Sequence, residues 1–120
     1  MTEDENAEVV EFSDLGVILT NIETVPGKTI TKHFGLVSGS TVRAKHIGRD
    51  IAASFKNIVG GELKGYTELL QESRKQAIIR MVQQAKELGA NAIVNIRFST
   101  SSITQGAAEL YAYGTAVKAE

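Results

Sequence analysis

Residues 88–99, Leu-Gly-Ala-Asn-Ala-Ile-Val-Asn-Ile-Arg-Phe-Ser, carry the change from helical to strand periodicity that decides the fold. Gly89 stands where a helix-ending glycine belongs, because glycine adopts the left-handed backbone conformation at little cost. From there apolar residues alternate with polar ones, and Ile93 is the one exception. The alternating apolar residues are Ala92, Val94, Ile96 and Phe98. A period of two is typical of a strand, so this stretch predicts a helix that ends at a glycine and a strand directly after it.

The residues before Gly89 predict a long helix over about 66–88. On a helical wheel one apolar stripe contains Tyr66, Leu69, Leu70, Ala77, Met81, Ala85 and Leu88. Ile78, Ile79 and Val82 widen this stripe beyond what a helix on a single sheet needs to bury. We therefore expect the helix to make a second apolar contact, with another subunit.

The residues after Phe98 predict a loop and a last strand. Ser, Thr and Gly dominate 99–106, which we interpret as the loop, and 110–117 forms the strand. One face of that strand is small, which lets a helix approach closely, and consists of Leu110, Ala112, Gly114 and Ala116. The opposite face consists of Tyr111, Tyr113, Thr115 and Val117. Neither face is typical of a surface that meets only solvent, which again indicates a subunit interface.

The N-terminal half predicts two further strands. Residues 17–20 form a short apolar run, 24–28 predict a turn, and 29–46 are rich in Thr, Val, Ile and Phe. Eighteen residues are too many for one straight strand. We therefore expect a bend or a bulge at Gly35 or Gly39.

Residues 50–59 predict a first, shorter helix, which the two glycines at 60–61 would end. The element order is then strand, strand, helix, helix, strand, strand. This order predicts an α+β fold: a single-domain ββααββ subunit over residues 15–120, with an antiparallel-rich sheet and its helices on one face.

Composition limits the class of protein. A chain of 120 residues with 42% hydrophobic residues is sufficient for one globular domain. No apolar run approaches the length of a membrane span, and the acidic start is not a signal peptide, so no membrane association is expected. The absence of cysteine excludes disulfides and thiolate chemistry, and it favours a cytoplasmic location.

Charge is unevenly distributed along the chain. Residues 1–14 contain six acids and no base, whereas the remaining residues contain eight acids and thirteen bases, a formal charge of +5. We expect 1–14 to be a flexible acidic leader. A second interpretation is a tether that neutralises a basic surface on the same subunit or on a neighbouring one.

No motif predicts catalysis or a cofactor. Residues 26–29 and 60–65 resemble parts of a phosphate-binding loop, but neither has the full set of residues or the strand-to-helix context. Ser38 lacks the glycine pattern of a nucleophile elbow. No catalytic residue and no cofactor is therefore predicted, and an enzyme is the less favoured class.

His33 and His46 are the two weak candidates for metal ligands. Zinc takes three or four ligands, usually histidine or cysteine at close spacing, and thirteen residues separate these two. They are interpreted as ordinary histidines on the sheet surface, so no metal site is predicted. The alternative is that one histidine from each of several subunits converges on a symmetry axis.

The segment 43–56 contains four Lys or Arg residues, one histidine and a single acid. Arg49 falls near the start of the first predicted helix, where free backbone N–H groups favour an anion. A small anion or phosphate is the candidate ligand. In the alternative, Asp50 caps the helix and Arg49 pairs with an internal carboxylate. Nucleic acid is not an expected partner, because the segment lacks stacking aromatic residues.

Several short motifs come in the order and spacing of a known family. They are Gly-Leu-Val-Ser-Gly at 35–39, Gly-Arg-Asp at 48–50, Gly-Gly at 60–61, Tyr-Thr-Glu at 66–68, Arg74, Gly-Ala-Asn-Ala at 89–92 and Ala-Tyr-Gly-Thr-Ala-Val at 112–117. Over residues 16–119 the chain resembles the YbjQ family, small bacterial and archaeal proteins described as "putative heavy-metal-binding". The resemblance implies a subunit related to dodecin-like folds that assembles into a ring of five. It implies no established activity.

The polar members of these motifs are the candidate ligand-binding residues: Arg49, Asp50, Tyr66, Glu68, Arg74 and Asn91. Their alternative role is a buried network that fixes the subunit or its interface. A chain without cysteine and with two separated histidines lacks the soft ligands that heavy metals prefer. The predicted function is a non-catalytic, ring-forming, ligand-binding or structural assembly. The alternatives are a metal-binding oligomer whose site is shared between subunits, or an enzyme with an inter-subunit site.

Overall fold

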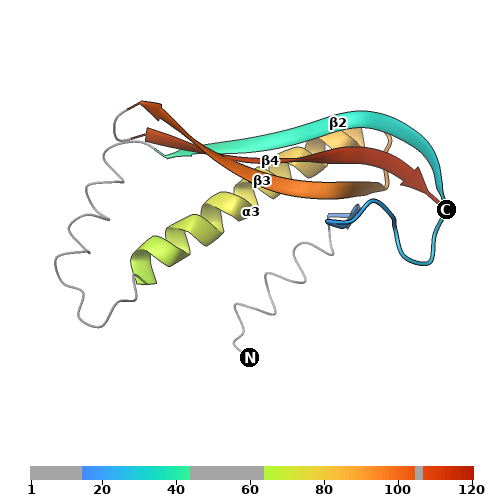
Figure 1. Ribbon diagram of the computed structural model, residues 1–120, viewed down its shortest axis with the longest axis horizontal. Coiled ribbons are helices and arrows are strands. Elements are labelled where there is room, and N and C mark those ends of the chain that lie inside the picture. Colours follow the sequence, from blue (N-terminus) through green and yellow to red (C-terminus); the bar gives the residue numbers. More distant parts are fainter. Residues whose placement is uncertain (1–14, 44–63, 105–106) are drawn as a thin grey trace.

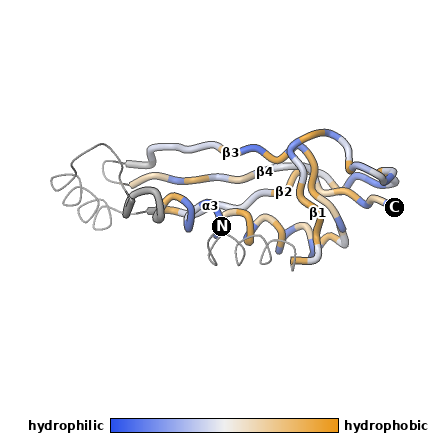
Figure 2. Tube along the Cα trace, turned by 90° about the horizontal axis from the view of Figure 1, so that it is seen from below, coloured by the Kyte–Doolittle hydropathy of each residue, from blue (hydrophilic) through white to orange (hydrophobic). Residues whose placement is uncertain are grey.

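A computed structural model describes residues 15–43, 64–104 and 107–120. Its elements, in chain order, are β1 (Ile18–Leu19), β2 (Ile30–Arg43), α3 (Lys64–Glu87), β3 (Ala92–Thr104) and β4 (Ala107–Ala119) (Figure 1). The strands form one sheet in the order β1-β3-β4-β2. β4 is antiparallel to both of its neighbours, and β1 pairs in parallel with the start of β3. Seen from the side, the strands form one layer and α3 lies against it (Figure 2).

The long helix ends as the sequence predicted. Gly89 has φ of 89°. Its N–H donates to the carbonyl of Lys86 at 3.0 Å, and the N–H of Ala90 donates to the carbonyl of Ala85 at 3.1 Å. These two bonds form the Schellman motif, which satisfies carbonyls that the end of the helix would otherwise leave free. The turn delivers the chain directly into β3.

The main core lies between α3 and the small face of the sheet. It contains Val17, Val37, Ala77, Met81, Val82, Ala85, Ala90, Ile93, Ala112 and Ala116. α3 lies very close to β2 at Gly39. A Cβ at this position would meet the backbone carbonyl of Ala77 and lie 2.5 Å from the Met81 nitrogen. Ala112 and Ala116 of β4 lie in the same core, so the predicted small face of β4 faces the helix.

A second, smaller core lies on the opposite face of the sheet. The connection between β1 and β2 places Val25 against Ala92, Val94, Val117 and Ala119. The change of face within β3 occurs at Asn95, a non-glycine residue with φ of 55° at a bulge between Val94 and Arg97. Beyond the bulge, Ile96 packs against the main core. The period-two pattern that predicted this strand is therefore divided between two faces.

Two sequence expectations about β3 and α3 are wrong in detail. Residues 99–104 are not a loop, because β3 continues to Thr104 and pairs with β4, which begins at Ala107 rather than at residue 110. The side chains of 99–102 are exposed, so the strand has no apolar pattern there to reveal it. Leu70 and Leu88, placed on the apolar stripe of the helix, are exposed, whereas Val82 is buried.

The first two strands match the sequence more closely. β2 has irregularities between Ile30 and Lys32 and between His33 and Gly35, and φ of Gly35 is 108°. The bulge expected at a glycine is therefore confirmed. The expected strand 17–20 is reduced to the two residues of β1. The predicted leader, the predicted helix 50–59 and residues 44–46 lie outside the described residues.

Candidate interaction surface

The two flanks of α3 differ in chemistry, and each lies over a different edge of the sheet. Ala77 and Met81 face the sheet over Gly39. Arg80 and Gln84 lie on the flank above β2 and bond to its backbone. Ile78, on the other flank, lies on the side of β3 and lines a hollow there. The helix therefore presents a polar flank to one edge strand and an apolar flank to the other.

The outer side of β2 is bonded to the helix. The N–H of Ser38 donates to Oε1 of Gln84 at 2.7 Å, and Nη1 of Arg80 donates to the carbonyl oxygen of Ser40 at 2.5 Å. The buried hydroxyl of Thr41 also donates to the Ser73 carbonyl, at 2.9 Å. These contacts fix the middle of β2 to α3.

The outer side of β3 is covered only near its start. β1 pairs with Ala92 and Ile93. The following connection accepts hydrogen bonds from the Asn95 and Ile96 amides, at 2.9 and 3.1 Å. Nη1 of Arg97 donates to the Asn21 carbonyl at 2.7 Å. From Arg97 to Thr104, no strand or loop of the described ranges pairs with this side of β3.

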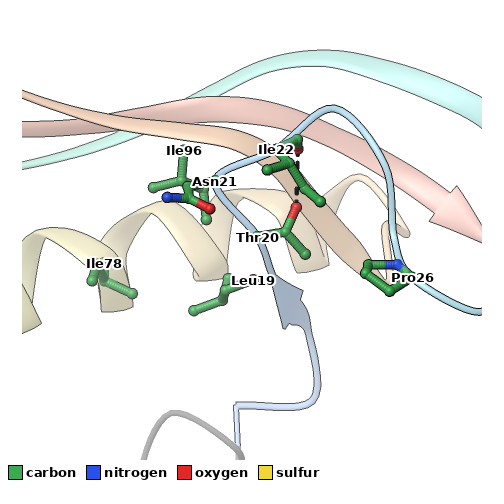
Figure 3. Close-up of a pocket in the computed structure, with 7 residues that line it drawn as sticks. All are labelled: Leu19, Thr20, Asn21, Ile22, Pro26, Ile78 and Ile96. Atoms are coloured by element: carbon green, nitrogen blue, oxygen red, sulfur yellow. Dashed lines mark hydrogen bonds between the residues drawn. The ribbon is translucent and has the colours of Figure 1, made fainter.

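A hollow of about 440 Å³ opens beside this free edge (Figure 3). It is lined by Leu19, Thr20, Asn21, Ile22, Pro26, Ile78 and Ile96. Its lining is mostly apolar, and the hydroxyl of Thr20 donates to the Ile22 carbonyl at 3.1 Å. Ile22 is 47% exposed at the hollow.

Phe98 extends the apolar surface along β3. It is 45% exposed and stands opposite Ala112, on the helix side of the sheet. We use the name open-edge surface for the hollow, Phe98 and the outer side of β3 from Arg97 to Thr104, with which no described segment pairs. An exposed apolar groove next to unpaired backbone groups is chemically suited to protein association, through burial of side chains and addition of hydrogen bonds.

The described members of the predicted ligand-binding set do not come together. Asn91 directly follows the C-terminal turn of α3, whereas Arg74 is exposed in its N-terminal half, about 20 Å away along the helix. Asn91 is half-buried, and both of its amide atoms bond to Ala119. Nε of Arg74 donates to the Leu70 carbonyl of the same helix at 3.3 Å.

The remaining predicted site residues lie at the start of α3, on β2 or outside the described residues. The backbones of Tyr66 and Glu68 lie in the first turns of α3. Arg49, Asp50 and His46 lie outside the described residues. His33 is exposed on β2, opposite Val117. Sequence analysis did not select Ile22, Phe98, Arg80 or Gln84, and only the surplus apolar width of the helix pointed toward this side of the molecule.

Comparison with known proteins shows the family to which this chain is related. Residues 17–120 match the model of the YbjQ family, whose description is "Putative heavy-metal-binding". The chain belongs to the YbjQ family. The resemblance inferred from the short motifs is thereby confirmed.

Relatives occur in bacteria and archaea. The chain is 64% identical to the UPF0145 protein of Hahella chejuensis over 104 residues, which are 87% of this chain and 100% of the relative. It is 56% identical to the UPF0145 protein of Archaeoglobus fulgidus over 102 residues, 85% and 94% of the two chains. A crystal structure of a DUF74-family protein of unknown function from Pediococcus pentosaceus has a TM-score of 0.56 at 14% identity, covering 88% of this chain and 99% of that one. That likeness concerns the fold alone.

The described residues of this YbjQ chain do not fit a soft heavy-metal ion. The chain has no cysteine. The thioether of Met81 is sealed in the core at 0% exposure. Within the described ranges no three His, Asp or Glu side chains are grouped closely enough to hold a metal ion. Because soft metals require thiolate, thioether or clustered imidazole ligands, we derive no metal chemistry for the subunit.

No helix in the described ranges is long and apolar enough to cross a membrane.

Proposed function

We propose that this YbjQ protein is the subunit of a closed ring of five copies, related to dodecin-like assemblies, which serves as a non-catalytic structural or ligand-binding assembly. The observation that carries the proposal is the open-edge surface. A strand edge that no described segment pairs, beside an apolar hollow, is a surface that another protein chain can cover. A second copy of the same chain is always available at the required concentration.

The energetics favour burial of this surface. Ile22 and Phe98 are each about half exposed, and full burial of a large apolar side chain contributes about 1.5–3 kcal/mol. New backbone hydrogen bonds along residues 97–104 would add to this gain. The number of copies comes from the family resemblance. A ring follows when each copy uses one surface as donor and a different surface as acceptor, and the rotation closes.

The ligand-binding part of the proposal rests on charge. Residues 15–120 carry a formal charge of +5, and a five-fold ring would repeat each basic segment five times. A small anion near Arg49 is therefore the proposed ligand class. Arg74 is the described member of the candidate set whose side chain is exposed to solvent, whereas Asn91 is used in the fold.

The test is the mass of the purified protein in solution. Sedimentation and native mass spectrometry should give about five times the 12.9 kDa subunit mass at micromolar concentration. Phe98→Lys should dissociate the assembly, because it places a charge on the surface to be buried. The matched control is Leu36→Lys, since Leu36 is 68% exposed on the other face of the sheet and its replacement should leave the mass unchanged.

Two results would contradict the proposal. A wild-type monomer at micromolar concentration would exclude the ring. Dissociation by Leu36→Lys but not by Phe98→Lys would show that the copies meet through the other face of the sheet.

A further inference from the structure

β2 is an edge strand, and two outward backbone groups in its middle are bonded to α3. β2 pairs with β4 on its inner side, and no other described strand pairs with it. In its middle, the Ser38 amide is bonded to Gln84 and the Ser40 carbonyl to Arg80. Residues two apart in a strand present their backbone groups to the same side, so Ser38 and Ser40 belong to one row of outward groups.

The spacing of the two helix residues matches the spacing of the two strand residues. Ser38 and Ser40 are about 6.7 Å apart along the strand, and Arg80 and Gln84 are about 6 Å apart along the helix. One turn of α3 therefore covers one repeat of the strand edge. The amide oxygen of Gln84 takes the place of a neighbouring strand's carbonyl, and the guanidinium of Arg80 takes the place of its N–H.

We infer that Arg80 and Gln84 close the β2 edge to strand addition, so that a second copy docks on the open-edge surface with a region other than its own β2 edge. The inference rests on the proposed function for the existence of the ring and adds the assignment of the seam. A neighbouring strand at β2 would have to displace both side chains and break both bonds. At β3, from Arg97 onward, no bond of this kind stands in the way among the described residues.

Among the described residues the subunit has one closed strand edge, at β2, and one open strand edge, at β3. If both edges were open, copies could add strand to strand without limit and form an open-ended sheet. A charged side chain held on an edge strand is a common device against such pairing. Arg80 supplies that charge at β2, so growth is restricted to contacts that use β3.

The test measures hydrogen exchange at the Ser38 amide in the intact assembly. In the wild type this amide should be protected. Gln84→Ala removes its acceptor and should speed its exchange about tenfold, because one hydrogen bond of ordinary strength is lost. The native mass should not change. The matched control is Gln83→Ala, since Gln83 is an exposed neighbour on the same helix whose side chain forms no hydrogen bond with any described residue.

Two outcomes would overturn the inference. If the Ser38 amide stays protected in the Gln84→Ala assembly, a strand of the neighbouring copy covers it, and the β2 edge is the seam. If the amide exchanges freely in the wild type, the edge is not closed. A wild-type monomer with a protected Ser38 amide has a different meaning, because it contradicts the proposed ring while the closure of β2 by Gln84 stands.

Discussion

Asn91 holds Ala119 by two hydrogen bonds. Its Nδ2 donates to the Ala119 carbonyl and its Oδ1 accepts from the Ala119 amide, both at 2.8 Å. The backbone of Asn91 also bonds to Ile18 and to Val117, so this one residue connects β1, the start of β3 and the end of β4.

We expect Asn91→Ala to lower the free energy of unfolding by about 2 kcal/mol, because it leaves two backbone groups of the buried Ala119 without partners. Chemical denaturation of the wild type and the variant would measure this change. Asn21→Ala is the control, since the Asn21 side chain forms no hydrogen bond within the described ranges. Equal losses in both variants would show that the contact with Ala119 contributes nothing specific.

Gly39 gives a second stability prediction. A Cβ at this position would overlap the Ala77 carbonyl and lie 2.9 Å from Cβ of Arg80. Because backbone atoms of a packed helix cannot move aside cheaply, Gly39→Ala should lower the free energy of unfolding by about 3 kcal/mol or more. Ser40→Ala, one residue along β2, retains the backbone carbonyl that binds Arg80 and should have little effect. A stable Gly39→Ala variant would mean that α3 can shift away from β2.

The left-handed conformation of Asn95 leads to a third prediction. A residue with a Cβ adopts φ of 55° at a cost, which asparagine tolerates better than alanine does. We expect Asn95→Ala to lower the free energy of unfolding by about 1 kcal/mol. Asn95→Gly should be less harmful, because glycine adopts this conformation freely. A larger loss from the glycine variant than from the alanine variant would show that the left-handed backbone conformation is not what makes the alanine variant less stable.

The elements that could be predicted from sequence are those with a local physical signal. Gly89 at the end of a periodic apolar stripe located the helix end, and small residues in the last strand located the face that α3 approaches. The stretch 99–104 was assigned to a loop because exposed Ser and Thr residues carry no periodicity. Their strand character comes from pairing with β4, a contact between residues that a local pattern does not encode.

The residues of the candidate surface could not be identified from the sequence. Ile22 and Phe98 are single apolar residues in unrelated segments. Ile22 lines the hollow, and the bulge at Asn95 places Phe98 on the helix side of β3, as it does Ile96. Arg80 and Gln84 were scattered polar residues on a helix, of the kind that usually face solvent. Their use as bonds to the β2 edge depends on how α3 lies across the sheet.

The last prediction concerns metal binding, which the family description names and the residues of this chain do not favour. We expect no zinc, copper or cadmium site of sub-micromolar affinity within one subunit, because the chain has no cysteine and the described residues contain no cluster of hard or imidazole ligands. Isothermal titration calorimetry with each ion should show only weak binding. One ion per chain at sub-micromolar affinity, abolished when His33 and His46 are both replaced by alanine, would contradict this prediction.

A ratio of one ion per five chains would instead favour histidines that converge on the symmetry axis of the ring. That ratio would be absent in a dissociated Phe98→Lys variant, whereas a site within the subunit would persist there, so the same titration on the monomeric variant identifies where the ligands come from.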